Sequence, residues 1–134
     1  MSHMNDDDFV HAFLNGSLPV AHFHHRDHLR LAWCLTRHLG LMAATRTITA
    51  GIRGFATQHG HPDKYHETLT LFWIRIVGHL MAARPDITEF AGFLATFPQL
   101  LDKDLPYRHW RRETMGSTIA RAHWVEPDLL ALPA

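Results

Sequence analysis

The spacing of apolar and polar side chains predicts helices along nearly the whole chain. Apolar residues recur every three or four positions in several stretches, each bounded by residues that typically start or stop a helix. We expect helices over residues 6–15, 25–39, 41–59, 63–83, 86–96 and 114–123. No stretch alternates with a period of two for long enough to predict a sheet. The sequence therefore predicts an all-α protein, a single-domain antiparallel helical bundle of about five to six helices over residues 5–134.

Capping residues set the predicted boundaries. Asn5 is a suitable N-cap for the first helix, and Gly16, Gly40 and Gly60 are suitable stops for the first three. The fourth helix starts at either Asp63 or Tyr65 by the same criteria. Its apolar residues cover most of its circumference, which predicts that it is the central and most buried helix.

The C-terminal third carries weaker helix signals. Residues 86–89 resemble a capping box for the fifth helix, and Pro98 ends that helix. We expect residues 99–112 to cross the bundle as a loop, and residues 124–130 to dock on the body as an extended tail. The opening Met1-Ser2-His3-Met4 resembles a cloning scar, so residues 1–4 are set apart from the domain.

Two glycines fall inside the third predicted helix. Gly51 and Gly54 each weaken a helix by roughly 1 kcal/mol relative to alanine. Glycines at such positions either permit close packing of a neighbouring helix or are tolerated defects. The sequence does not separate these two interpretations.

Histidines stand out on the inner sides of the helices. At 100° per residue, Arg26, Arg30 and Arg37 define the outer side of the 25–39 helix. His28 lies opposite them, and His25 lies at the edge of the inner side if the helix begins early enough. His59 and His66 face inward by the same criterion, at the end of the third helix and the start of the fourth respectively.

These inward histidines are predicted to meet at one end of the bundle. Short connections make consecutive helices antiparallel, so the starts of the second and fourth helices lie beside the end of the third. His25, His28, His59, His66 and Glu67 all fall at that end. We consider the remaining histidines bystanders near the site (His22, His24 and His61) or surface or interface residues (His11, His38, His79, His109 and His123).

Neutral imidazoles with one carboxylate suit a divalent transition metal. We expect His25, His28, His59 and His66 as ligands of Zn, Fe, Mn, Ni or Cu, with haem ligation as a lesser alternative. Glu67 is a ligand, a general acid or base, or a group that orients a ligand histidine. Tyr65 is a candidate proton donor or substrate contact, and Asp27 a candidate partner for a histidine.

Composition narrows the class of protein further. The 134 residues carry equal numbers of acidic and basic side chains, 13 of each, which argues against nucleic acid or an anionic membrane as a partner. The single cysteine, Cys34, cannot form an intrachain disulfide, and no apolar run is long enough for a membrane span. We therefore expect a cytoplasmic protein that binds a small molecule. The sequence is compatible with either a monomer or a homodimer.

Four segments carry a resemblance to a known family. They are residues 23–33, with the pattern Phe-x-His-x-Asp-His-[Leu/Val]-Arg-x-Ala-Trp, residues 56–60, residues 65–70, with Tyr-His-Glu-Thr-[Leu/Ile]-Thr, and residues 127–129. In these the chain resembles a family of small, uncharacterised bacterial helical proteins. The resemblance implies that His25, His28, His59, His66 and Glu67 are the family's shared positions.

Three functional hypotheses follow. The first is a small metal-dependent enzyme that acts on a small organic molecule, by lyase, hydrolase or non-haem oxygenase chemistry. The second is a sensor or accessory module that binds a metal or a small molecule without catalysis. In the third, the histidines and Glu67 form a buried hydrogen-bond network that only fixes the packing of the helices.

Overall fold

The computed structural model describes residues 4–133 and is all-helical within them. It confirms the predicted fold class. The α-helices of this part of the chain are α1 (Asp6–Leu14), α2 (His25–Leu39), α3 (Leu41–Gln58), α4 (Glu67–Ala83), α5 (Phe90–Thr96), α6 (Arg112–Met115) and α7 (Thr118–Ala122). Short 3₁₀ turns lie between them: η1 (Val20–His22), η2 (Pro62–Lys64), η3 (Pro98–Leu101) and η4 (Leu105–Arg108). The proposed cloning scar lies outside the described residues except for Met4.

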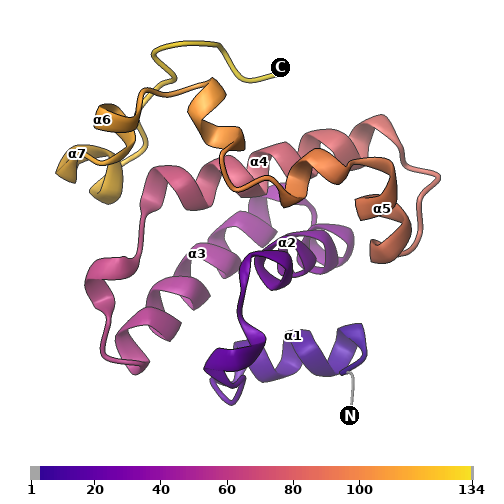
Figure 1. The fold of residues 1–134 in the computed structure, drawn as a ribbon. Helices are drawn as coiled ribbons and strands as arrows, with labels where there is room; N and C mark the ends of the chain where they lie inside the picture. Colours follow the sequence, from indigo (N-terminus) through magenta and orange to yellow (C-terminus); the bar gives the residue numbers. More distant parts are fainter. Residues whose placement is uncertain (1–3, 134) are drawn as a thin grey trace.

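Helices α2, α3 and α4 form the centre of the molecule, with α1 and α5 against α2 and with α6 and α7 beside the start of α4 (Figure 1). Gly40 alone separates α2 from α3, and its φ of 80° is a conformation that favours glycine. Because this connection is so short, α3 runs back along α2. The N-terminal ends of α2 and α4 and the C-terminal end of α3 therefore share one end of the bundle, as predicted.

Helix α2, rather than α4, is the most buried helix. It buries six side chains, whereas α4 buries four. The reason is that α2 contacts α1, α3, α4 and α5. Even its arginines pack: the guanidinium groups of Arg26, Arg30 and Arg37 lie over aromatic rings, and the Arg30 side chain is only 16% exposed. Arg26 and Arg37 are nevertheless exposed, as predicted for the outer side of α2, whereas Arg30 is partly covered by Phe9 of α1.

Several predicted boundaries move. Helix α4 starts at Glu67, because residues 62–64 form a 3₁₀ turn and the His66 ring accepts a hydrogen bond from the backbone N–H of Leu69 as its N-cap. Helix α5 starts at Phe90, because the Asp86 carboxylate binds the Arg84 guanidinium instead of capping. The predicted last helix is two helices.

The break in that last helix lies at Gly116 and Ser117. Gly116 ends α6, and the Ser117 hydroxyl accepts a hydrogen bond from the N–H of Ala120 to cap α7. The tail that follows docks as predicted: the Trp110 indole donates to the Val125 carbonyl, and His109 donates to that of Leu130. His109 is therefore an interface residue, buried under the tail.

Two apolar clusters stabilise the fold. The larger lies between α1, α2, α3, α4 and α5, and the smaller packs the C-terminal segment on α4, around Phe72 and Trp110. Within residues 4–133, no helix is both long and apolar enough to cross a membrane.

Candidate functional site

The shared end of the bundle contains a cavity of about 390 Å³. Its polar wall comes from the start of α2, the start of α4 and the connection between η3 and η4. The side chains of that wall are His24, His25, His28, Lys64, Tyr65, His66, Thr70, Lys103 and Tyr107. Its apolar wall is made by Phe23, Ala32, Ile48, Ile52, Leu69, Trp73 and Ile74.

A second cavity of about 400 Å³ adjoins the first on the α3 side. Five residues line both cavities, namely Phe23, His28, Ile52, Lys64 and Tyr65. The second cavity adds His59 and His61, which lie just after the C-terminal end of α3 in the chain. We call the two together the joined cavity.

His28 is the central polar group of the joined cavity. Its ring stacks on Phe23, with 4.1 Å between ring centroids. Among residues 4–133, neither ring nitrogen has a hydrogen-bond partner. The pKa of His28 is lowered to about 4, chiefly by burial; the charge of His25 acts in the same direction, Asp27 opposes it, and His24 has a smaller lowering effect. At neutral pH the joined cavity therefore presents an uncharged imidazole.

His25 lines the same cavity one turn earlier on α2. Its Nε2–H donates to the carbonyl of Leu100 at 2.8 Å, and its ring meets Trp73 edge to face. Burial lowers the pKa of His25, the bond to Leu100 raises it, and the charge of Lys103 lowers it again. The bond to Leu100 fixes the tautomer and leaves Nδ1 as the one free nitrogen.

His66 uses both ring nitrogens to hold the backbone. Its Nε2–H donates to the Met115 carbonyl at 2.6 Å, and its Nδ1 accepts from the N–H of Leu69 at 3.1 Å. Burial lowers its pKa, the bond to Met115 raises it, and the charge of Arg121 lowers it. His66 therefore caps α4 and anchors α6, so it has no free lone pair for a metal in this arrangement.

His59 shares only the second cavity with His28, and Glu67 is turned away from both cavities. The Nδ1–H of His59 donates to the Phe55 carbonyl at 2.9 Å, and its ring lines only the second cavity. The Glu67 carboxylate accepts from the Tyr65 hydroxyl at 2.5 Å and lies 3.4 Å from the Arg53 guanidinium. Glu67 lines neither cavity.

Tyr65 is a wall of the joined cavity rather than a free donor. Burial, together with its hydrogen bond to Glu67, raises the pKa of Tyr65 to about 12, so the phenol stays protonated. Its proton is directed to Glu67 and not into the cavity. The Asp27 carboxylate likewise points to the helix start, where it accepts from the backbone N–H of His24 at 2.9 Å.

The hydrogen bonds of the histidine rings determine which of them could coordinate a metal ion at this end of the bundle. In the part of the chain that the structure describes, no three His, Cys, Asp or Glu side chains form a group that could hold a metal ion. The expected residues share one end of the bundle, but His66 and His59 are engaged with carbonyl oxygens. Among the described residues, His25 and His28 share the first cavity, His28 and His59 share the second, and each of these three rings keeps at least one nitrogen without a hydrogen-bond partner.

Four residues that line the site are not among the candidates from the sequence. Lys64 and Lys103 line the first cavity, and Phe23 and Trp73 flank its histidines. The two lysines could have been noticed, because they are the only ones in a chain with eleven arginines. The position of Trp73 on α4 fits a core residue as well as a cavity wall, so the sequence pattern does not separate the two.

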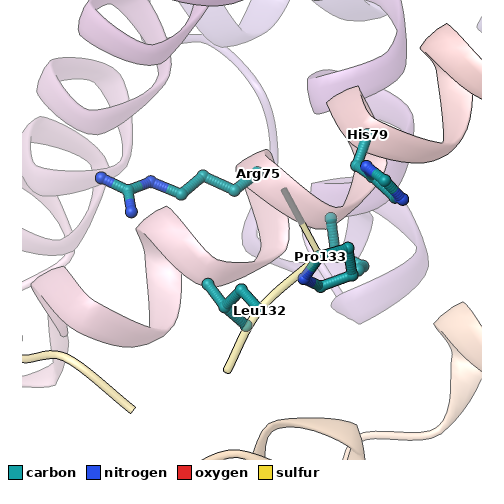
Figure 2. Close-up of a pocket in the computed structure, with 5 residues that line it drawn as sticks. Arg75, His79, Leu132 and Pro133 are labelled. Carbon is teal, nitrogen blue, oxygen red and sulfur yellow. The ribbon is translucent and has the colours of Figure 1, made fainter. Parts of the chain in front are cut away.

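A further pocket lies away from this site, between α4 and the tail. Its volume is about 100 Å³, and Arg75, Ile76, His79, Leu132 and Pro133 line it. Figure 2 shows Arg75 and His79 on successive turns of α4, with their side chains directed apart and the tail below them. The Arg75 guanidinium instead lies over the Trp124 ring, at 4.0 Å from its centroid. This pocket is too small for a substrate.

Comparison with known proteins adds no assignment to this geometry: the chain matches no family model, no curated protein and no solved structure.

Proposed function

We propose that the protein binds a small organic molecule in the joined cavity, and that the neutral imidazole of His28 is a polar contact of that molecule. The observation that carries this proposal is the His28 ring, which faces both cavities and has no hydrogen-bond partner among the described residues. An imidazole nitrogen that faces a cavity without a protein partner is free to hydrogen-bond to a bound ligand.

The shape and lining of the cavity support a ligand of modest size. A volume of about 390 Å³ lies within the range typical of small-molecule pockets. Such pockets are mostly apolar with a few polar groups that orient the ligand, and this one places its histidines opposite Ile48, Ile52 and Ile74.

Binding is supported more directly than catalysis. With its pKa near 4, His28 is a weak base at neutral pH, so it is better suited to accept a hydrogen bond than to remove a proton. The Tyr65 proton is committed to Glu67. The second of the sequence hypotheses, a small-molecule-binding module, is therefore our leading proposal.

A metal-dependent enzyme is the second candidate, and the His25–His28 pair favours it. Both rings line one cavity from consecutive turns of α2, and each retains a free nitrogen. Neutral imidazole is the form that binds transition metals. Two ligands leave several positions for water or substrate, and the ion would supply Lewis-acid chemistry there.

Nuclear magnetic resonance of the histidine ring C–H groups tests the leading proposal. A panel of fragment-sized acids, amides, alcohols and amines is titrated into the parent protein and into His28→Phe, with His38→Phe as the matched control at an exposed position of the same helix. We expect some fragments to shift the His28 signals, and the same fragments to bind His38→Phe but not His28→Phe. Absence of binding across the panel, or equal binding to His28→Phe, contradicts the proposal.

Elemental analysis of tag-free protein after incubation with Zn, Fe(II), Mn, Ni or Cu decides the second candidate. Near-stoichiometric metal in the parent, lost in a folded His25→Ala, His28→Ala variant, would favour the enzyme. If the parent protein retains no metal, the metal-dependent enzyme is contradicted and the small-molecule-binding module remains.

A further inference from the structure

The lining of the joined cavity carries positive charge without any negative charge. Both lysines of the chain, Lys64 and Lys103, line the first cavity, and Lys64 also lines the second. No arginine lines either cavity, although arginines supply most of the positive charge of the chain. Among the described residues, no aspartate or glutamate lines them.

Asp63, Asp102 and Asp104 adjoin the two lysines in the sequence, but they are exposed and do not line either cavity, and Asp104 lies 3.6 Å from the Arg112 guanidinium. Two other carboxylates near the start of α2 and α4 are already paired. Asp27 accepts a hydrogen bond from the start of α2, and Glu67 lies between the Tyr65 hydroxyl and the Arg53 guanidinium. The N-terminal ends of α2 and α4 both reach the first cavity, and helix N-termini favour negative charge. The electrostatic field of the first cavity therefore selects for anions.

Burial shows which end of the first cavity is the mouth. Lys64 and Lys103 are exposed, whereas Ala32, Ile48 and Ile74 are at most 2% exposed and form the deep end. The aromatic rings of Phe23 and Trp73 lie beside the histidines of this cavity. The positive charge of the two lysines thus lies at the mouth of the first cavity, and the apolar side chains line its deep end.

We infer that the ligand of this site is an organic anion with an apolar ring-sized body, whose acidic group lies with Lys64 and Lys103 at the mouth and whose body lies between Phe23 and Trp73 beside His28. This inference rests on the proposed function, because it names the class of molecule that the joined cavity takes. Within the cavity lining, a cation would meet two ammonium groups and, among the described residues, no carboxylate. An uncharged molecule would leave both lysines without a role.

The test compares acids with their uncharged counterparts. The probes are 2-naphthoate and indole-3-acetate, each beside its primary amide, and affinities are measured by titration calorimetry at low and high salt. We expect each acid to bind at least about tenfold more tightly than its amide at low salt, a difference of about 1.4 kcal/mol. Added salt should reduce this preference, because the lysines are exposed.

Reductive methylation with ¹³C-formaldehyde gives a direct readout of the lysines. It keeps their charge and labels only Lys64, Lys103 and the amino terminus. We expect the acids to shift both lysine signals. The variant Lys64→Gln, Lys103→Gln should bind acid and amide equally, whereas Arg46→Gln, Arg84→Gln, which removes two charges away from the cavity lining, should keep the preference.

The possible results distinguish failure of the anion inference from failure of the proposed binding function. Amides that bind as tightly as the acids, or an unchanged preference in the lysine variant, would overturn the anion inference while leaving the cavity as a binding site. If none of these probes binds while a fragment of the earlier panel shifts the His28 signals, the anion inference alone fails. If no probe and no fragment shifts those signals, the proposed function itself fails.

Discussion

The histidines at the end of the bundle differ in what their ring nitrogens contact. His25, His59 and His66 each donate to a carbonyl of another segment or turn, and such bonds hold the ring in place and fix its tautomer. His28 makes no such bond among the described residues and instead stacks on Phe23. One histidine is therefore left free for a ligand while its neighbours stabilise the walls around it.

The buried neutral state of His28 makes stability depend on pH. Above pH 6.5 the ring is uncharged in both the folded and the unfolded chain. Below it the unfolded chain gains a proton that the folded protein does not accept until about pH 4. We expect the free energy of unfolding to fall between pH 6.5 and 4, by up to roughly 2–3 kcal/mol from this residue.

Urea unfolding at several pH values checks this prediction. The His28→Gln variant should show a flatter pH dependence than the parent, and His38→Gln, which replaces an exposed histidine of the same helix, should not. His25 and His66 contribute in the same direction, since burial lowers the pKa of both. Charges facing His28, from His24, His25, Asp27 and Lys64, stay in place in both variants. Equal slopes in all three proteins would contradict the prediction.

The sequence predicts that the histidines lie together. It does not predict which of them hydrogen-bond to the backbone and which keep free ring nitrogens for a ligand. Helical periodicity and short connections place His25, His28 and His66 at one end, and all three line one cavity. The second nitrogen of His66 is taken by the Met115 carbonyl, 49 residues further along the chain. No local pattern predicts a contact at that separation, so the use of each ring nitrogen required the structure.

At the scale of single elements, α3 shows why two similar glycines differ. A Cβ at Gly51 would lie 2.4 Å from ring carbons of Phe13 on α1, whereas a Cβ at Gly54 would have nothing within 4 Å. Phe13 is buried and packs against Phe23. Gly51 therefore permits the close approach of α1, and Gly54 is a tolerated defect.

Alanine substitution separates the two glycines. We expect Gly51→Ala to lower the free energy of unfolding by about 1–3 kcal/mol, because the Phe13 ring has to move within a packed core. Gly54→Ala should raise it by up to about 1 kcal/mol through helix propensity. Chemical denaturation of the pair measures both, and each variant is the control for the other. Effects of the same sign and size would contradict the assignment.

The elements themselves were largely readable from local signals. The bounds of α2 are as predicted, because a polar start, an amphipathic stripe and Gly40 all agree. The start of α4 was less readable, since the 3₁₀ turn at residues 62–64 and the capping ring of His66 shift it to Glu67. Asp86 was wrongly assigned as a cap because its pairing with Arg84 competes for the same carboxylate.

At the scale of the whole molecule, the C-terminal segment holds the start of α4 in place. Thr68 is fully buried, and its hydroxyl lies 2.7 Å from the carbonyl oxygens of both Ala120 and His123. The same oxygen accepts from the N–H of Val125 at 3.3 Å. One side chain on α4 thus joins the end of α7 to the beginning of the tail.

Replacing this hydroxyl should loosen the tail. We expect Thr68→Val, which keeps the shape of the side chain, to lower the free energy of unfolding by roughly 1–3 kcal/mol, because buried backbone groups lose their partner. Hydrogen exchange at the Val125 amide should accelerate more than exchange in α2. The control is Thr57→Val, whose exposed hydroxyl bonds only within α3. Uniform acceleration across the molecule would contradict a local role.

Residues 115–125 fix the start of α4 through the contacts described above. These contacts therefore also set the order in which the site is completed during synthesis. Helices α2 and α3 leave the ribosome before α4 and carry only part of the cavity wall, including His28 and Ile48. The backbone of Tyr65 and the ring of His66 acquire their anchors only when Met115 and Arg121 have followed. A nascent chain stalled before α6 would therefore carry His28 in a cavity open on its α4 side.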